Sequence, residues 1–232
     1  MLTKARGIVI KNIHYGETSL ISKILLENEG IKTFLTNGVR SKKGKFKPAH
    51  FQIFTLLELD YYAKENANFL RIKEAKLNPV LHGLQGNIPK ILLVQKMADF
   101  ASRIFQDNFS EAATFYFFEE YLLYLNENKI HPDAFYIHFL ISISNILGIS
   151  LAHLPSYPSY FDLEKLEKTN TEFGGHKISV EEQEFISTTF HWGISEHERL
   201  TSFQGIKKLS ETLEKFYTQK TFKKRIGTQS RR

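Results

Sequence analysis

Five cations lie within eight residues of the stretch GVRSKKGKFKPAHFQIF, residues 38–54. They are Arg40, Lys42, Lys43, Lys45 and Lys47, with Phe46 among them. No acidic residue occurs from Ile31 to Leu57. A cluster of like charges this dense destabilises a fold unless it stays solvated or meets an anionic partner. Because phosphates are such partners and an exposed aromatic can stack a base, the stretch predicts a nucleic-acid contact.

Further cations lie on segments that we expect to be strands. Arg6 and Lys11 are on the first of these, and Arg71 and Lys73 are on the last. They are candidates to extend the phosphate-binding surface. The alternative is that they are solvated charges that protect strand edges from aggregation.

No motif of an enzyme is present. Neither G-x-S-x-G nor G-x-x-x-x-G-K-[ST] occurs, and the nine histidines show no triad spacing. A nuclease would need carboxylates to hold Mg²⁺, but the acids of the first 78 residues fall mostly at expected turns or strand ends. A metal-dependent nuclease therefore stays an alternative, and we expect no catalytic residue.

Metal binding is not indicated either. The chain has no cysteine, which excludes disulfides, thiolate catalysis and Cys-ligated zinc. Four histidines surround the segment that is hardest to interpret, and their spacings fit no standard zinc pattern: His153, His176, His191 and His197. We expect no cofactor.

The charge distribution predicts two parts with different partners. Residues 1–78 carry a net charge of +7, residues 79–219 carry −7, and residues 220–232 carry +6. The positive charge of residues 1–78 and of residues 220–232 favours a polyanionic binding partner. The first residues lack the apolar run of a signal peptide and no apolar stretch approaches membrane-spanning length, so we expect a cytoplasmic protein without a membrane partner.

Residues 5–76 alternate with a period near two, which predicts strands. The expected strands are Ala5–His14, Ser19–Glu27, Lys32–Asn37, Gln52–Tyr62 and Asn68–Glu74. Five short strands with one long basic connection suit a small β-barrel of the OB type, and an SH3-like barrel is the main rival. We therefore predict an OB-fold domain over residues 1–78.

After Asn78-Pro79 the hydrophobic period changes to 3.6, which predicts a helical domain over residues 79–219. We expect Asn87 to cap a first helix, in which the residues along one face are Ile91, Val94, Ala98, Ala101 and Phe105. We expect Ser110 to cap a second helix, in which the residues that recur at helical spacing are Phe117, Phe118, Tyr121, Leu122 and Leu125. A third helix is expected over Asp133–Leu147, with Gly148 as its stop. A fourth is expected to begin at the capping box Ser179-x-x-Glu182 and to end near Phe190, and a fifth is expected over Ser202–Tyr217.

Two segments lack a clear hydrophobic pattern. Residues 149–178 show weak periodicity and are expected to be irregular. Residues 220–232, KTFKKRIGTQSRR, are expected to form a disordered basic tail. Its cations Lys223, Lys224 and Arg225 are possible further nucleic-acid contacts.

The motifs also resemble a known family, the RecO recombination mediators of bacterial DNA repair. The resemblance is carried by Ala5-Arg6-Gly7-Ile8-Val9-Ile10, by Tyr15-Gly16-Glu17-Thr18-Ser19-Leu20-Ile21, by Gly38-Val39-Arg40 with the cations after it, and by Phe54-Thr55-Leu56-Leu57-Glu58-Leu59. These motifs span about sixty residues in the family's order. Beyond Pro79 the match is looser, with Leu147-Gly148, Phe161-Asp162 and Gly174-Gly175 as landmarks.

The resemblance implies an α+β fold in two parts, an N-terminal OB-fold β-barrel followed by an all-helical C-terminal domain. It also implies DNA binding, annealing of complementary strands, and help in loading RecA onto strands coated by single-stranded DNA-binding protein (SSB). The implied partners are single- and double-stranded DNA, RecR and the acidic C-terminal peptide of SSB, in the bacterial cytoplasm with the nucleoid. Many relatives carry a Cys-ligated zinc module, whereas this chain has Ser156 and Ser159 in that region.

The hypothesis that joins these observations is a non-enzymatic DNA-binding mediator. An acidic SSB peptide would need a cation on the helical domain, and the candidates are Lys207, Lys208 and Lys215. The alternatives are an OB-fold RNA-binding protein without annealing activity and a metal-dependent nuclease. Strand preference, the partner groove and the oligomeric state stay open.

Overall fold

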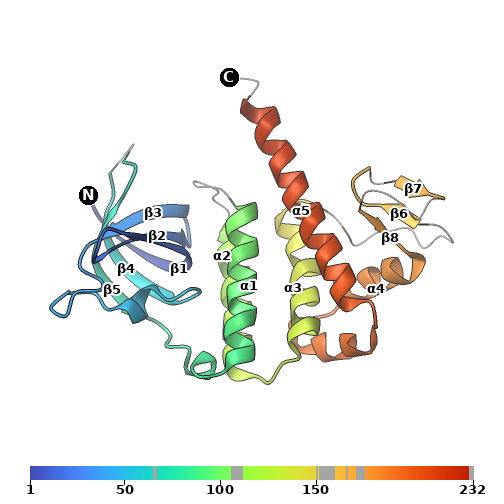
Figure 1. The fold of residues 1–232 in the computed structure, drawn as a ribbon, viewed down its shortest axis with the longest axis horizontal. Helices are drawn as coiled ribbons and strands as arrows, with labels where there is room; N and C mark the ends of the chain where they lie inside the picture. Colours follow the sequence, from blue (N-terminus) through green and yellow to red (C-terminus); the bar gives the residue numbers. More distant parts are fainter. Residues whose placement is uncertain are drawn as a thin grey trace. The chain divides into compact units, whose positions relative to one another are not determined.

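A five-stranded antiparallel sheet begins the chain in the computed structural model (Figure 1). Its strands are β1 (Leu2–Tyr15), β2 (Ser19–Leu26), β3 (Gly30–Thr36), β4 (Leu56–Tyr62) and β5 (Arg71–Leu77). The structure describes residues 1–64, 67–105, 112–149, 151, 160–165, 167–170 and 176–229, with side chains as far as residue 221.

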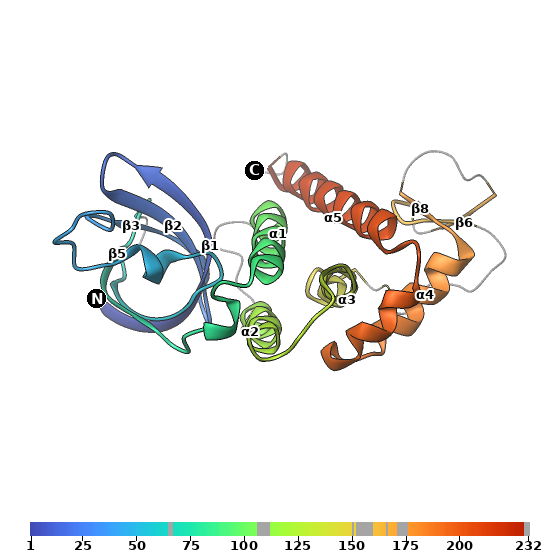
Figure 2. The same ribbon diagram turned by 60° about the horizontal axis from the view of Figure 1, so that its bottom comes forward.

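The sheet closes into a barrel. Its strand order is β3-β2-β1-β4-β5, and a parallel bridge between Phe34 and Leu70 joins the two outer strands. Leu35 N donates to Leu70 O at 3.0 Å and Leu70 N donates to Thr33 O at 2.9 Å. Figure 2 shows the strands curving around the enclosed core. This topology is that of an OB-fold, so the predicted fold class is confirmed.

The first strand pairs with both neighbours, β2 on one side and β4 on the other. Its register with β2 shifts between Val9 and Lys11, which bends the strand around the barrel. Gly7 lies close to the neighbouring strand, since a Cβ atom there would be 2.6 Å from Cγ2 of Ile24. A larger side chain at this position would push β2 outward.

The connection from β3 to β4 differs from the prediction. The predicted strand begins at Gln52, but residues 48–51 form the 3₁₀ turn η1 (Pro48–Phe51) and β4 begins at Leu56. Phe54 has a φ of +58°, a left-handed conformation that no regular strand contains. Similarly, the strand expected over Asn68–Glu74 is β5, Arg71–Leu77.

Two helices pack on the barrel, α1 (Ile88–Ile104) and α2 (Ala112–Glu127), after the short 3₁₀ turn η2 (His82–Leu84). Asn87 caps α1 by accepting from Lys90 N at 3.2 Å, as predicted, whereas Ser110 lies outside the described residues. The two helices run side by side (Figures 1 and 2). The ring of Phe54, 1% exposed, lies 5.3 Å from that of Phe118 on α2.

The buried faces of these helices follow the predicted stripes with two exceptions. Ile91 is 47% exposed and Phe117 is half-buried.

The chain divides into a unit of Met1–Asn128 and a unit of Lys129–Arg232. The predicted boundary near Asn78 is where strands give way to helices, but α1 and α2 belong to the same unit as the barrel, because their apolar faces pack against it.

The second unit contains α3 (Pro132–Ile146), α4 (Val180–Phe190), the 3₁₀ segment η3 (Ile194–Ser202) and α5 (Ile206–Gln229). The capping box at α4 is present as predicted, since Glu182 N donates to Ser179 Oγ at 3.2 Å and Ser179 N to Glu182 Oε2 at 2.7 Å. Tyr217 Oη on α5 donates to Leu140 O on α3 at 2.9 Å, and burial raises the pKa of this phenol.

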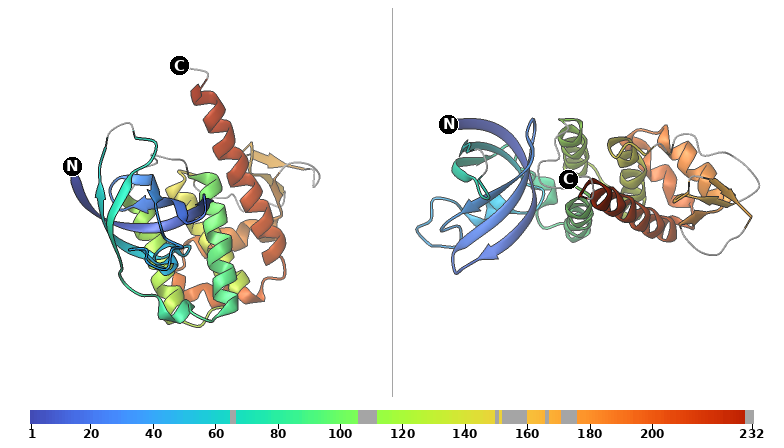
Figure 3. Two further views of the ribbon diagram at one scale, coloured as in Figure 1. Left: turned by 60° about the vertical axis from the view of Figure 1, so that its left-hand side comes forward. Right: turned by 90° about the horizontal axis from the view of Figure 1, so that it is seen from above.

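Two expectations for this unit need correction. The segment 149–178 contains a small antiparallel sheet of order β7-β6-β8, with β6 (Tyr160–Asp162), β7 (Glu167–Thr169) and β8 (Lys177–Ile178). Strands of two or three residues are too short to show a period in the sequence. The basic tail continues α5 as a helix to Gln229 (Figure 3), because most of its residues are compatible with a helix and the preceding turns give it a nucleus.

Membrane crossing is not indicated for the described part of the chain, in which no helix combines the length and the apolar composition that a span requires.

Phe54 allows a test of how the barrel and α2 are joined. We predict that Phe54→Ala lowers the free energy of unfolding by about 3–5 kcal/mol, because it removes a buried ring. Phe54→Gly should be less destabilised than Phe54→Ala by about 1 kcal/mol, because glycine adopts a positive φ without strain. Urea denaturation measures both.

The matched control is Phe69→Ala, which removes a ring that is 42% exposed. This substitution should lower the free energy of unfolding only slightly. An equal loss of stability in Phe54→Ala and Phe69→Ala, or a Gly variant less stable than the Ala variant, would contradict the role assigned to Phe54.

Candidate nucleic-acid interface

The cationic loop, residues 38–47, is folded rather than extended. Ser41 N donates to Gly38 O at 3.0 Å and Gly44 N donates to Ser41 O at 3.0 Å. Gly38 has a φ of +71°, and a Cβ atom on Gly44 would lie 1.9 Å from Gly38 O. The two glycines therefore permit a tight double turn.

Two apolar residues anchor the cationic loop in the barrel core. Val39 is 2% exposed and Phe46 is 8% exposed. The ring of Phe46 packs edge-on against Phe51, with 6.0 Å between the centroids. The sequence leaves Phe46 undecided between stacking a base and folding back onto the domain, and the structure shows that it folds back.

The cations of the loop fall into two groups. Arg40 Nη2 donates to Gly16 O at 2.7 Å, and Lys45 Nζ donates to Lys73 O at 2.6 Å, so these two tie the loop to the turn after β1 and to β5. The other three are Lys42, Lys43 and Lys47. All five cations are exposed and present charge to solvent.

The last strand adds to the same surface. Arg71 Nη1 lies 3.2 Å from Asn37 Oδ1, directly before the loop, and Lys73 is exposed beside Lys45. These contacts follow from barrel closure, which brings β5 next to β3. The predicted residues Arg40, Lys42, Lys43, Lys45, Lys47, Arg71 and Lys73 therefore gather at one end of the barrel.

Lys11 lies on the outer face of β1, with Ile13 and Tyr15 on the same side of the strand. Ile13 is 48% exposed and Tyr15 is 56% exposed. In register, Lys11 is opposite Lys23 and Ile13 is opposite Ile21. The outer face thus combines cations with an exposed aromatic ring, which is the composition of a single-strand binding surface.

Tyr15, Ile13 and Lys23 are not among the residues predicted from the sequence. Tyr15 directly precedes Gly16, whose carbonyl accepts from Arg40, so the backbone at Tyr15 lies near the cationic loop. The alternation of Lys11, Ile13 and Tyr15 is visible in the sequence, but only the register with β2 shows that Lys23 joins them.

Arg6 has a different environment from the other predicted cations. Its guanidinium is 3.5 Å from Glu27 Oε1, forms an ion pair with Glu119 on α2, and lies 5.0 Å from the centroid of the Phe115 ring. Tyr116 Oη donates to Glu27, which raises the pKa of the phenol. Arg6 therefore joins the barrel to α2, and we leave it out of the candidate interface.

Another side of the barrel, formed by β4, the end of β5 and the start of β1, has mixed charge. Lys4 is in register with Asp60 and Asp60 with Glu74, while Glu58 is in register with Lys76. Other acids have structural partners: Glu29 accepts from the buried Tyr61 phenol, whose pKa burial raises. Among the described residues, no group of three or more His, Cys, Asp or Glu side chains could hold a metal ion.

The histidines considered as ligands make separate local contacts. His176 Nε2 lies 2.8 Å from Gln219 Oε1, His191 Nδ1 lies 2.8 Å from Ser187 O, and His197 Nδ1 lies 2.9 Å from Ile194 O. His153, Ser156 and Ser159 lie outside the described residues. The described histidines are not brought together as a ligand set.

In the second unit, Lys207, Lys208 and Lys215 are all exposed on α5. Lys207 Nζ lies 3.8 Å from Asp133 Oδ2. Lys208 and Lys215 are seven residues apart and so share one face of the helix. The side chains of Lys223, Lys224 and Arg225 lie outside the described residues.

Comparison with known proteins gives a consistent result. A family model described as "Recombination protein O N terminal" matches residues 1–79. The chain is 30% identical over 165 residues to the DNA repair protein RecO of Bacteroides fragilis, covering 70% of this chain and 68% of that protein. It is 26% identical to RecO of Flavobacterium johnsoniae over 187 residues, 78% of each, and 25% identical to RecO of Azobacteroides pseudotrichonymphae over 231 residues, 94% and 92%.

The contacts of Arg6 predict that its loss affects stability more than nucleic-acid binding. Arg6→Ala should lower the free energy of unfolding by about 1–2 kcal/mol, a modest value because the guanidinium is partly exposed. Lys11→Ala should leave stability nearly unchanged. Urea denaturation and titration with labelled single-stranded DNA measure the two effects. A stable Arg6→Ala protein with much weaker DNA binding would show that Arg6 contacts DNA instead.

Proposed function

The chain belongs to the RecO family of DNA repair proteins, and from this we propose that it is a DNA-binding recombination mediator that acts without catalytic residues. The observation that carries the proposal is the gathering of cations at one end of the OB barrel, together with the exposed Tyr15 directly before Gly16, whose carbonyl accepts from Arg40. An OB barrel with such a surface can hold phosphates and stack unpaired bases at once.

In this proposal the exposed Lys42, Lys43 and Lys47 bind phosphates. Arg40 and Arg71 contact the neighbouring turns and add positive charge to the same surface. Tyr15 stacks a base, a contact worth roughly 1–3 kcal/mol in comparable sites. Lys11 and Lys23 are directly opposite in register on the outer face of β1 and β2, so both can add positive charge to the same surface.

Annealing is the finer activity that we propose. Two complementary strands repel each other through their phosphates, and a protein that neutralises part of that charge lowers the cost of bringing them together. The helical second unit, with Lys208 and Lys215 on one face of α5, is the proposed contact for the acidic SSB peptide. RecR binding and assistance in loading RecA onto SSB-coated strands complete the proposed role, on the nucleoid in the cytoplasm.

Salt dependence tests the phosphate contacts. If about five phosphates are neutralised, the affinity for single-stranded DNA should fall with salt at a log–log slope of about −3.5. Lys42→Ala/Lys43→Ala should reduce the magnitude of the slope by about 1.4, because two contacts are lost. Fluorescence anisotropy over a salt series gives the slopes.

The matched control is Lys4→Ala/Lys76→Ala, which removes two cations from the mixed-charge side of the barrel. This variant should keep the wild-type slope. A slope near zero in the wild type, or the same reduction in both double variants, would refute the proposed surface.

Strand annealing tests the mediator function itself. The wild type should accelerate annealing of complementary oligonucleotides, both naked and coated with SSB, and Lys42→Ala/Lys43→Ala should slow both reactions. Lys208→Glu/Lys215→Glu should slow annealing only when SSB coats the strands, because it alters the proposed peptide contact. Fluorescence quenching between labelled strands follows the reaction.

The same assay separates the alternatives. Mg²⁺-dependent cleavage that EDTA abolishes would indicate a nuclease. Tighter binding to RNA than to DNA, with no annealing, would indicate an RNA-binding OB protein. Either result would overturn the proposal.

A further inference from the structure

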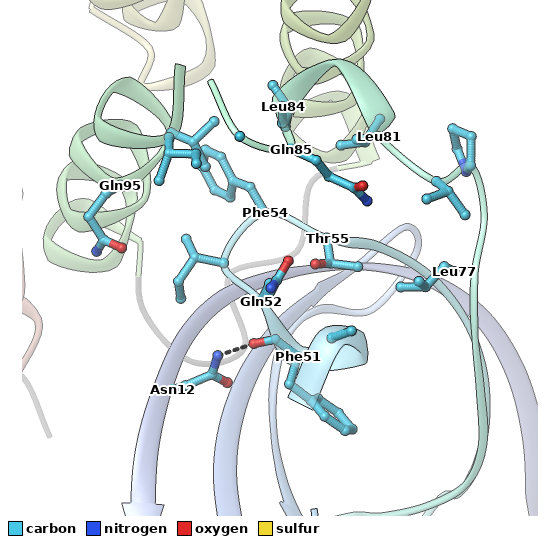
Figure 4. Close-up of a pocket in the computed structure, with 17 residues that line it drawn as sticks. Asn12, Phe51, Gln52, Phe54, Thr55, Leu77, Leu81, Leu84, Gln85 and Gln95 are labelled. Atoms are coloured by element: carbon cyan, nitrogen blue, oxygen red, sulfur yellow. Dashed lines mark hydrogen bonds between the residues drawn. The ribbon is translucent and has the colours of Figure 1, made fainter. Parts of the chain in front are cut away.

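An open groove of about 570 Å³ lies in the first unit, between the segment that leads into β4, the chain that leaves β5, and the first turns of α1 (Figure 4). Phe51 and Phe54 come from the first of these segments, Leu77 and Leu81 from the second, and Ile91 from the helix. None of the cations of the proposed DNA surface lines it.

The lining is uncharged. The seventeen described residues that form it include no ionisable side chain. Its polar groups are the amides of Asn12, Gln52, Gln85 and Gln95 and the hydroxyl of Thr55. Figure 4 shows the polar ends of Gln52, Thr55 and Gln85 within the ring of lining side chains. The groove therefore offers apolar surface with a few neutral donors and acceptors.

Two of the amides are held in place by the fold. Asn12 Nδ2 donates to Phe51 O, and Asn12 Oδ1 accepts from Ser22 Oγ at 2.7 Å. Gln95 Nε2 donates to Asp99 Oδ1 at 2.9 Å. Gln52, Gln85 and Gln95 are exposed. Asn12 thus fixes the wall near β1, and the exposed amides of Gln52 and Gln85 can meet a ligand.

Apolar side chains border the groove at the solvent boundary. Val80 is 38% exposed, Ile91 is 47% exposed, and Ile88, one turn before Ile91, is 67% exposed. Exposed apolar surface beside a concave site is typical of interaction surfaces. Phe54, which lines the groove, has a φ of +58°, and strained backbone of this kind concentrates at ligand-binding sites.

The chemistry of the lining selects the occupant. A phosphate or an acidic peptide tail would have to leave water without meeting a cation, which is costly. Side-chain amides both donate and accept, as the peptide backbone does, so they can pair with an extended chain. The volume of about 570 Å³ fits a few side chains of such a chain.

We propose that this groove binds an extended, uncharged and predominantly apolar peptide segment of a partner protein. Gln52 and Gln85 pair with the backbone of the segment, and its side chains pack on Leu81, Val80 and Ile91. This surface is separate from the DNA surface, so the proposal does not depend on the proposed function.

To test this, the full-length protein is used to select binders from a phage-displayed library of random twelve-residue peptides. The enriched peptides are then synthesised, and their affinities for the protein are measured. We expect enrichment of uncharged peptides with several apolar residues. Ile91→Glu should weaken their binding by at least about tenfold, because a charge then lies in the apolar lining. Fluorescence anisotropy with labelled peptides gives the dissociation constants.

Leu92→Glu is the matched control, because Leu92 is 64% exposed on the same helix but does not line the groove. It should bind the peptides as the wild type does, and both variants should keep wild-type DNA binding and unfolding midpoints.

Any of the following results would overturn the proposal: no enrichment, enrichment of acidic peptides, equal loss in both variants, or peptide binding that Ile91→Glu leaves unchanged. Self-association in analytical ultracentrifugation that Ile91→Glu abolishes would assign the groove to a second copy of the chain, and would also overturn it.

Discussion

The pairing of β3 with the chain entering β5 is the constraint on which the first unit depends. Two backbone hydrogen bonds at Leu70 close the barrel, and a closed barrel has no free sheet edge. Closure also decides which side chains meet. Without it, Arg71 and Lys73 would lie on an outer strand far from residues 38–47, whereas in the barrel they adjoin the cationic loop. The proposed phosphate-binding end of the barrel is therefore a product of topology.

The cations of the barrel divide by their partners. Arg6 contacts Glu27, Glu119 and the Phe115 ring, so its charge contributes to the joint between the barrel and α2. Arg40 and Lys45 donate to backbone carbonyls and so hold the cationic loop on the turn after β1 and on β5. Lys42 and Lys43 are exposed at its tip. A rigid loop presents these charges at fixed spacing, which lowers the entropic cost of binding a flexible strand.

Phe54 links the barrel, α2 and the groove. Its ring packs on Phe118 of α2, its backbone N donates to Val9 O at 2.7 Å, and its side chain lines the apolar groove. A left-handed residue at this point turns the chain from the 3₁₀ segment η1 into β4. The proposed DNA surface and the groove thus belong to one unit but differ in chemistry, charged in one case and neutral in the other. A mediator can in this way hold nucleic acid and a protein segment together.

Alternation, capping residues and charge density are local properties. The order of amino acids alone was therefore enough to predict the five barrel strands to within a few residues, most helix boundaries, the OB class and the position of the cation cluster. It could not decide the fate of Phe46, which the barrel buries, or of Arg6, which α2 engages, since both depend on residues distant in sequence. Tyr15 as part of the surface and the short strands β6 to β8 also escaped prediction. Only the tertiary structure decided which cations face solvent and where the neutral groove lies, because barrel closure and helix packing bring together residues that are distant in the sequence.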